Sequence, residues 1–252
     1  MSRRQRLDAD MVRRRLVESR AEAARAIDAK LVLVNGSIAD KPARLVDHGD
    51  SVVLQGPPAR FVSRGGDKLD AALDSFGVDV RGLRVLDAGA STGGFTDCLL
   101  QRGAACVVAV DVGHGQLHPK IRDDERVTVF ERFHVLDITA EAIGGAVDLA
   151  VADLSFISII RALPHLIGAC RPHADLVLLV KPQFEAGKAE VDRGSGVIRD
   201  PVVHERVRGE VSAGLAANAC DVLGWIESPL TGAQGNREFL VHARLGRSGS
   251  AP

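Results

Sequence analysis

The sequence predicts a Rossmann-like α/β domain with a mostly parallel sheet, preceded by a small α+β unit. Apolar runs alternate with helical segments from residue 84 onward, a Gly-rich turn follows the first run, and the chain before them has a different, basic pattern. An apolar content of 46% in 252 residues suffices for one large or two unequal cores. We expect domains at 1–58 and 66–246, a linker at 59–65 and a disordered tail at 247–252.

The front unit is predicted to hold two helices and a small sheet. Ser19-x-x-Glu22 is a capping box, the pattern in which a hydroxyl and a carboxylate accept backbone N–H groups at a helix start. Asn35-Gly36 signals a tight turn. In chain order, we expect a helix capped by Asp8 and running to Val17, a helix from Ser19 to Ala29, strands at Leu31–Val34 and Ser51–Leu54, and a boundary at Gly56-Pro57-Pro58.

Basic residues gather in this front unit. Residues 1–60 contain 12 Lys or Arg against 8 Asp or Glu, although the whole chain has a net charge of −1. Arginines crowd the first helix and the start of the second. Such a cluster is either a solvated helix face or a set of contacts for phosphate groups.

The order of residues in the front unit resembles the alpha-L RNA-binding domain, a small fold of a ribosomal protein, pseudouridine synthases and tyrosyl-tRNA synthetases. The matching positions are Arg6, Leu7, Ser19, Arg20, Ala23, Ile27, Val34, Asn35, Gly36, Gly49 and Asp50. The chain departs at Ala29-Lys30, where the family usually has a glycine. The resemblance implies RNA contacts at Arg3, Arg4, Arg6, Arg14, Ser19, Arg20, Lys30 and Asn35.

The second unit alternates strands and helices in the manner of a doubly wound sheet. Its last two strands are joined by a short segment, which suits an antiparallel hairpin rather than a crossover. We expect a helix over Gly66–Gly77, strands at Arg84–Leu86, Ala105–Val110, Val127–Phe130, Val147–Ala152 and Leu176–Val180, helices near Ile157–Cys170 and Pro201–Leu223, and the closing pair Trp225–Ser228 and Arg237–Ala243.

A Gly-rich turn after the first strand predicts a cofactor loop. Asp87 closes the strand, three glycines follow it before a helix that begins near Thr96, and Asp111 ends the second strand, where a carboxylate can accept hydrogen bonds from ribose hydroxyls. The spacing G-x-x-x-G-G differs from the dinucleotide fingerprint and no Lys-Ser or Lys-Thr follows, so a pyrophosphate ligand is disfavoured. The alternative is a turn with a structural role only.

The pattern D-x-G-x-x-x-G-G resembles the first motif of S-adenosylmethionine-dependent methyltransferases. The resemblance implies S-adenosylmethionine as the cofactor. It implies cofactor contacts at Asp87, Gly89, Ala90, Ser91, Gly93, Gly94, Phe95 and Asp111.

Charged residues stand at the ends of two apolar strands. Asp153 and Lys181 follow strands whose carboxyl ends meet at one edge of the sheet, where ligands of such sheets bind. If the last strand is antiparallel, Glu238 at its start reaches the same edge, and Lys68 on the preceding helix can join it. The pattern predicts a cluster of alternating charge; solvated loop residues or a mutual ion pair are the alternatives.

These four residues resemble the Lys-Asp-Lys-Glu tetrad of FtsJ-like ribose 2′-O-methyltransferases, and the whole chain resembles the TlyA family, historically labelled hemolysin A. The matching segments are 63–69, 87–96, 111–117, 153–158, 181–185 and 235–238. The resemblance implies methylation of ribose 2′-hydroxyls, with cytidine expected, in ribosomal RNA or ribosomal subunits. Lys181 is the expected activating residue, oriented with Lys68 by Asp153 and Glu238. Glu131-Arg132-Phe133 follows the third strand, where the family contacts adenine.

Three other functions remain as alternatives. An RNA-binding, ribosome-associated protein would use the cofactor fold as a scaffold, but such a protein has no need of two facing lysines. A base methyltransferase commonly carries Asn/Asp-Pro-Pro-Tyr/Phe where this chain has Asp153-Leu154-Ser155-Phe156. Direct membrane lysis is disfavoured because the sequence has neither a span nor a long basic amphipathic segment.

The remaining signals are negative. Cys98, Cys106, Cys170 and Cys220 lack C-x-x-C spacing, so we expect reduced thiols. His114 and His118 have glycine and proline neighbours and are read as loop residues, so no metal is expected. No secretory signal is recognised, which favours the cytoplasm, and no membrane or obligate protein partner is expected.

Overall fold

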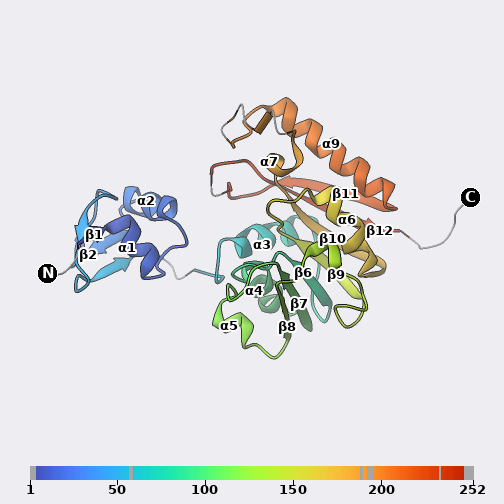
Figure 1. Cartoon of the computed structure of the whole chain (residues 1–252), viewed down its shortest axis with the longest axis horizontal. Helices are drawn as coiled ribbons and strands as arrows, with labels where there is room; N and C mark the ends of the chain where they lie inside the picture. The colour runs from blue at the N-terminus through green and yellow to red at the C-terminus, as the bar shows by residue number, and fades with distance from the viewer. Residues whose placement is uncertain are drawn as a thin grey trace, which may run out of the picture. The chain divides into compact units, whose positions relative to one another are not determined.

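The structure is a computed structural model that describes residues 4–56, 59–187, 190–191, 194, 196–232 and 234–246. The chain divides into two compact units, Met1–Ala59 and Arg60–Pro252. Figure 1 shows both, and each is considered by itself. The expected linker at 59–65 falls at the start of the second unit. The expected tail at 247–252 and the predicted RNA contact Arg3 lie outside the described residues.

The front unit packs two helices against short strands around its own apolar core. Strands β3, β2 and β5 form one antiparallel sheet, and β1 pairs with β4. The expected second helix and the two expected strands are present as α2, β2 and β5, and β1, β3 and β4 were not predicted. The elements are β1 (Gln5–Arg6), α1 (Leu7–Arg13), α2 (Arg20–Asp28), β2 (Val32–Val34), β3 (Ser37–Ile38), β4 (Leu45–Val46) and β5 (Val52–Leu54).

The first helix differs from the expectation. It begins at Leu7 and ends at Arg13, so the predicted cap at Asp8 and end at Val17 are wrong. The carboxylate of Asp8 instead accepts hydrogen bonds from Arg6 and Arg20, and Arg15 leaves the helix with a left-handed φ of 59°. Because the helix already begins at Leu7, the cap position falls on Arg6, whose side chain makes no capping hydrogen bond.

The capping box and the Asn35-Gly36 turn of the front unit are confirmed. Ser19 Oγ accepts the N–H of Glu22 at 3.2 Å, and the carboxylate of Glu22 accepts the N–H of Glu18 at 3.0 Å. Asn35 and Gly36 adopt φ of 52° and 81° and turn β2 into β3. Lys30, where the alpha-L pattern usually has glycine, adopts a left-handed φ of 62°.

The second unit is a seven-stranded sheet in the order β11-β12-β10-β9-β6-β7-β8. Only β12 runs antiparallel to β10 and β11; β6–β10 are parallel. This confirms the fold class. The elements are α3 (Gly65–Phe76), β6 (Arg84–Ala88), α4 (Gly94–Gln101), β7 (Cys106–Asp111), α5 (Pro119–Arg122), β8 (Val127–Glu131), η1 (Val135–Asp137), β9 (Val147–Ala152), α6 (Ile159–Gly168), β10 (Cys170–Val180), α7 (Pro182–Glu185), α9 (Pro201–Ala217), β11 (Cys220–Glu227) and β12 (Phe239–Leu245).

Several boundaries move from their expected places. Asp87 lies inside β6 rather than at its end, and α4 begins at Gly94 rather than near Thr96. Helices α6 and α9 end early because β10 and β11 begin at Cys170 and Cys220. The short elements α5, η1 and α7 were missed, since four residues or fewer carry no periodic signal.

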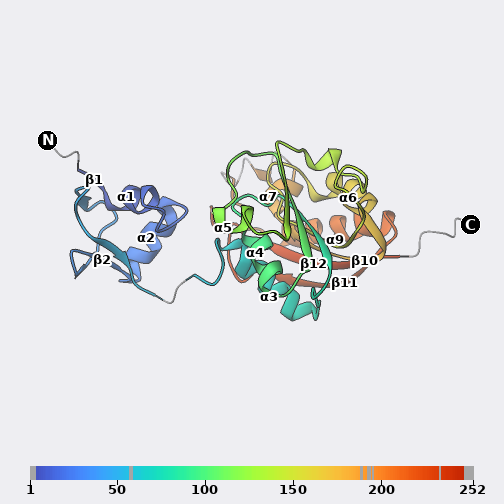
Figure 2. The same cartoon turned by 90° about the horizontal axis from the view of Figure 1, so that it is seen from below.

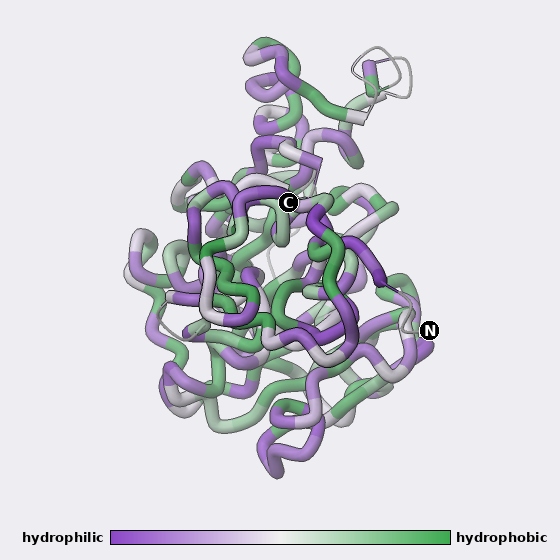
Figure 3. Tube along the Cα trace, turned by 90° about the vertical axis from the view of Figure 1, so that its left-hand side faces the viewer, coloured by the Kyte–Doolittle hydropathy of each residue, from purple (hydrophilic) through white to green (hydrophobic). Residues whose placement is uncertain are grey.

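Helices cover both faces of the sheet, α3 and α4 on one and α6 and α9 on the other (Figure 2). Consecutive strand residues alternate between two apolar clusters, as the two-residue period of a strand requires. The colours of Figure 3 change within single helices from hydrophilic to hydrophobic, the pattern of helices with one buried side. The carboxyl ends of the parallel strands therefore share one edge between these layers.

Candidate active site

Three strands bring charged residues to one edge and one face of the sheet. Asp153, Lys181 and Glu238 adjoin β9, β10 and β12, and the register that pairs Val180 with Phe239 makes Lys181 and Glu238 the next cross-strand neighbours. The residues two positions away are Val151, Leu179 and Leu240, all in the core under α3 and α4. Residues two apart share a face of a sheet, so all three point toward α3, which carries Lys68.

The four side chains form two ion pairs. Lys68 Nζ lies 2.6 Å from Glu238 Oε2, and Lys181 Nζ lies 2.5 Å from Asp153 Oδ1. The ammonium of Lys181 also donates a hydrogen bond to Ser155 Oγ at 3.1 Å. Glu238 is 3% exposed. The predicted tetrad residues are therefore adjacent, and each lysine has its own carboxylate.

A cavity of about 550 Å³ opens beside Asp153 at this edge. Its lining comes from the ends of β6, β7 and β9 and from the chain after β8, as expected of a ligand site in a parallel sheet. Of the predicted cofactor residues, Gly89, Ser91 and Asp111 line it.

Asp111 organises the rim of the cavity. Its Oδ2 accepts the N–H of Ser91 at 2.8 Å, and its Oδ1 accepts the N–H of Gly113 at 2.7 Å. An ionised carboxylate offers about four acceptor positions, so both oxygens can still accept ribose hydroxyls.

Gly89 is required by close backbone contact. Its φ is +85°, and a Cβ there would lie 2.5 Å from the carbonyl oxygen of Asp153. Any side chain would push apart the ends of β6 and β9, which form the cavity wall.

The other predicted loop residues lie behind the cavity lining. A Cβ on Gly94 would meet Ser63 Oγ at 2.3 Å, and one on Gly93 would contact Leu117, so these glycines serve packing around α4. Phe95 belongs to the core under α3 and α4, as does Ala90. None of the four lines the 550 Å³ cavity.

Asp87 supports the site from within the core. It is 0% exposed, and its Oδ2 accepts the hydroxyl of Thr96 at 2.6 Å. The pKa of Asp87 is raised to about 7, chiefly by burial and also by the charges of Asp153 and Asp111, against the hydrogen bond from Thr96. Its second oxygen has no hydrogen-bond partner among the described residues.

The sequence reasoning missed much of the lining. It placed the adenine contact near Glu131-Arg132-Phe133, and Phe133 does line the cavity, but Glu131 instead accepts the N–H of Gly115 at 2.7 Å and pairs with His114 at 2.5 Å. These two contacts join the loop after β7 to the last residue of β8. The unpredicted lining residues are Ala88, Val110, Val112, Gly113, Gln116, His134, Val135, Leu154, Ser155, Phe156 and Ile157.

Phe156 is the most unusual of these residues. It is 93% exposed and adopts a left-handed φ of 66°, which is strained for an aromatic residue. Its ring centroid lies 5.5 Å from that of Phe184, and Lys181 Nζ lies 5.9 Å from the Phe184 ring. An exposed aromatic surface thus stands beside the lysine and the cavity.

Most predicted RNA contacts of the front unit hold the unit together. Arg6 and Arg20 bind Asp8, Arg14 binds Asp10, and Arg4 binds Asp47. Ser19 caps α2 and Asn35 bonds Asp50 across its turn. Lys30 is exposed and has no ion pair within the described part of the chain.

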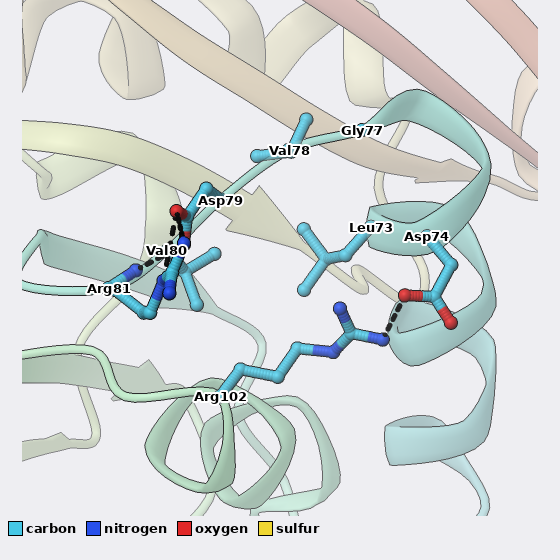
Figure 4. A pocket seen from close by; sticks show the side chains of 8 residues that line it. All are labelled: Leu73, Asp74, Gly77, Val78, Asp79, Val80, Arg81 and Arg102. Atoms are coloured by element: carbon cyan, nitrogen blue, oxygen red, sulfur yellow. Dashed lines mark hydrogen bonds and ion pairs between the residues drawn. The ribbon is translucent and has the colours of Figure 1, made fainter.

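A second hollow, of about 350 Å³, lies at the opposite end of the strands (Figure 4). Its charged side chains are already paired: Arg81 with Asp79, and Arg102 with Asp74. No predicted site residue lines it, so it does not compete with the cavity at Asp153.

Metal and membrane features are not part of this site. Within the described ranges, no group of three or more His, Cys, Asp or Glu could hold a metal ion, and no helix is long and apolar enough to cross a membrane. All four cysteines are free thiols, and burial raises the pKa of Cys98 and Cys170 to about 12.

The fold and the two lysine–carboxylate pairs beside the cavity define a methyltransferase of the Rossmann-like class. The chain belongs to the FtsJ-like methyltransferase family, which it matches over residues 61–245, and within that family to the TlyA group. Residues 5–52 match the S4 domain, where the alpha-L unit was expected.

Individual relatives agree with this assignment. The chain is 49% identical to the 16S/23S rRNA (cytidine-2′-O)-methyltransferase TlyA of Mycobacterium tuberculosis, over 97% of this chain and 91% of the relative. It is 32% identical to the 23S rRNA (cytidine-2′-O)-methyltransferase TlyA of Campylobacter jejuni, over 72% of this chain and 70% of the relative. A solved structure from Streptococcus thermophilus that carries the hemolysin label is 39% identical, with a TM-score of 0.81, and the match covers 98% of this chain and 90% of that chain.

Proposed function

We propose that this protein transfers a methyl group from S-adenosylmethionine to ribose 2′-hydroxyls of cytidine in ribosomal RNA. The observation that carries the proposal is the Lys181–Asp153 pair, which stands at the wall of the cavity with the Lys68–Glu238 pair on the same face. Both named TlyA relatives act on cytidine 2′-hydroxyls of ribosomal RNA.

The cavity suits S-adenosylmethionine. Its volume of about 550 Å³ is within the usual range for small-molecule sites, its lining is largely apolar, and Asp111 is placed for ribose hydroxyls. Absence of a phosphate-binding loop agrees with a cofactor that carries an adenosine and an amino acid. In this proposal, Gly89 and Ser91 bring their backbone close to the cofactor. The remaining residues of the predicted loop hold it in place without lining the cavity: Asp87, Ala90, Gly93, Gly94 and Phe95.

The chemistry follows from the lysines. When bound, S-adenosylmethionine supplies an electrophilic methyl group. Lys181 Nζ is placed to hold the attacking ribose hydroxyl. As the neutral amine it would take the hydroxyl proton while the O–C bond forms and the methyl–sulfur bond of the cofactor breaks, with the sulfur leaving as a neutral thioether. Asp153 stabilises the ammonium that results, and Lys68 on α3, paired with Glu238 beside β12, orients the hydroxyl.

Phe156 supplies the second half of substrate binding in this proposal. Base stacking on an aromatic ring stabilises single-stranded RNA contacts by about 1–3 kcal/mol per base. A target base stacked on Phe156 would place its own ribose near Lys181. The exposure and the strained backbone of Phe156 both support this role.

The RNA substrate is engaged by the front unit as well. An S4 domain and the exposed Lys30 support phosphate contacts there. We propose ribosomal subunits as the substrate; the name of the M. tuberculosis relative gives both 16S and 23S rRNA.

Mapping of ribose methylation tests the proposal. Purified subunits from cells that lack this protein should gain 2′-O-methylcytidine when incubated with the protein and S-adenosylmethionine. An RNA with a single 2′-deoxy substitution at the target should bind and receive no methyl group. Methylation of that deoxy RNA at the normal rate would instead establish a base methyltransferase, and binding without any methyl transfer would favour the scaffold function.

A further inference from the structure

Two loops at the site are connected by successive side-chain contacts. One loop follows β9 and holds Asp153 and Phe156; the other follows β10 and begins at Lys181. The contacts, in order, are Lys181 to Ser155 at 3.1 Å, the rings of Phe184 and Phe156 at 5.5 Å, and Glu185 to Ser158 at 2.5 Å. Only the first of these lies at the catalytic lysine.

Glu185 makes the innermost contact. Its Oε2 accepts the hydroxyl of Ser158, and its Oε1 accepts the N–H of Ile159 at 2.7 Å, so both oxygens bind the first turn of α6. A carboxylate is favoured at this end of a helix by the exposed N–H groups. Burial raises the pKa of Glu185, which these hydrogen bonds oppose.

We propose that Glu185 is a positioning residue for methyl transfer, which clamps the loop after β10 to the loop after β9 and so holds Lys181 and Phe156 in their reactive places. The proposal rests on the function proposed above. Glu185 contacts Ser158 and Ile159 rather than substrate, and nothing in the tetrad assigns it a role.

The two catalytic-side contacts need such an anchor. The lysine side chain is long and flexible, so the position of its ammonium depends on the backbone that carries Lys181. Phe156 is held in a strained left-handed conformation, which persists only when surrounding structure enforces it. Glu185 lies four residues after Lys181 and accepts two directed hydrogen bonds. Their donors, Ser158 and Ile159, lie two and three residues after Phe156 on the facing segment.

Glu185→Gln is the direct test, because it keeps the volume and removes the second acceptor. With the full-length protein and purified ribosomal subunits, the single-turnover rate should fall by about 10- to 100-fold, the loss expected when reacting groups shift by about an ångström. The melting temperature should stay near wild type. The loss of rate at saturating S-adenosylmethionine should exceed any change in the dissociation constant of that cofactor, since residues 153–157 also line the cavity. Glu205→Gln, an exposed carboxylate on α9, is the matched control and should keep the full rate.

Ser158→Ala and the double variant add a coupling measurement. Because both residues act through one contact, the double variant should be little slower than Glu185→Gln alone. Hydrogen exchange of residues 153–160 should rise in Glu185→Gln, whether or not substrate is present.

The outcomes separate this proposal from the proposed function. An unchanged rate, or a loss explained fully by weaker cofactor binding or unfolding, would overturn the clamp. Unchanged exchange in residues 153–160 would also overturn it. If the wild-type protein leaves ribosomal riboses unmodified, the proposed function fails, while the exchange measurement still decides whether Glu185 anchors the loop.

Discussion

The ammonium of Lys181 lies 2.5 Å from the carboxylate of Asp153, although 27 residues of chain and helix α6 separate the two strand ends. The parallel pairing of β9 with β10 brings them together, because parallel neighbours end at the same edge. The methyl transfer proposed above needs a base held in place, and this pairing restrains the position of Lys181.

Lys181→Ala should remove methyl transfer and preserve binding of both cofactor and RNA. Loss of a general acid–base group costs on the order of 10² to 10⁴ in rate. Lys181→Arg should not restore activity, because the guanidinium stays protonated and cannot accept the hydroxyl proton. Single-turnover methylation with calorimetry of cofactor binding checks both variants; activity in the arginine variant would exclude Lys181 as the base.

Gly89→Ala should weaken cofactor binding strongly, because the new methyl group would overlap the carbonyl of Asp153. Gly82→Ala is the matched control: Gly82 also has a positive φ, of +73°, but its Cβ would meet nothing within 4 Å. Calorimetric titration with S-adenosylmethionine compares the two. An affinity for S-adenosylmethionine in Gly89→Ala equal to that of the control would show that close contact at Gly89 does not govern cofactor binding.

Phe156→Ala should raise the KM for ribosomal RNA by more than it weakens cofactor binding, because Phe156 is only one of several residues that line the cavity. Loss of about 1–3 kcal/mol of stacking corresponds to roughly 5- to 150-fold. Phe156→Tyr should retain most of the activity, since it keeps the ring. Leu223→Ala, at a residue 51% exposed on β11, serves as a control for loss of surface apolar area. A normal KM for Phe156→Ala would exclude stacking on this ring.

Asp87→Asn should change how stability depends on pH. The pKa of Asp87 is raised to about 7 in the folded protein from its ordinary 3.8, so the folded state holds a proton that the unfolded state releases earlier. Its stabilising contribution is complete below the unfolded pKa and is lost as pH rises through about 7, at about 1.4 kcal/mol per pH unit between 5 and 7.

Urea unfolding at pH 5 and pH 8 measures this effect. The variant should lose less stability over that interval than the wild type. Asp79→Asn is the control, because Arg81 lowers the pKa of Asp79 to about 2, below the interval. Parallel pH dependence of wild type and Asp87→Asn would contradict the prediction.

Lys30→Gln should weaken RNA binding and reduce the slope of log affinity against log salt by about 1. Arg14→Gln should instead lower the melting temperature, because Arg14 binds the buried Asp10 and the carbonyl of Asp50. Binding titrations at several salt concentrations and thermal unfolding distinguish the two. A salt slope unchanged in Lys30→Gln would remove that residue from the RNA interface.

The amino-acid sequence alone predicts the class of fold and the cluster of Lys68, Asp153, Lys181 and Glu238. Apolar runs that alternate with helical segments, together with the Gly-rich turn, predict a parallel sheet, and strand ends with charged residues predict the edge at which Asp153 and Lys181 meet. These signals are local, so they can be read without knowing the packing.

The neighbours of each side chain depend on the tertiary structure. Arg6 and Arg20 of the front unit, which were predicted to contact phosphates, bind Asp8, and Asp8 itself lies inside α1 rather than at its cap position. Glycine spacing could not separate Gly89, at the cavity wall, from Gly94, which packs against Ser63.

The exposure of Phe156 and the clamp at Glu185 also depend on chain segments far apart in sequence, β9 with β10 and α6 with α7. Partner choice arises from long-range packing, where hydrogen-bond geometry and excluded volume select among many residues of similar type. Sequence periodicity reports which face of an element is buried, whereas the tertiary fold decides against what it is buried.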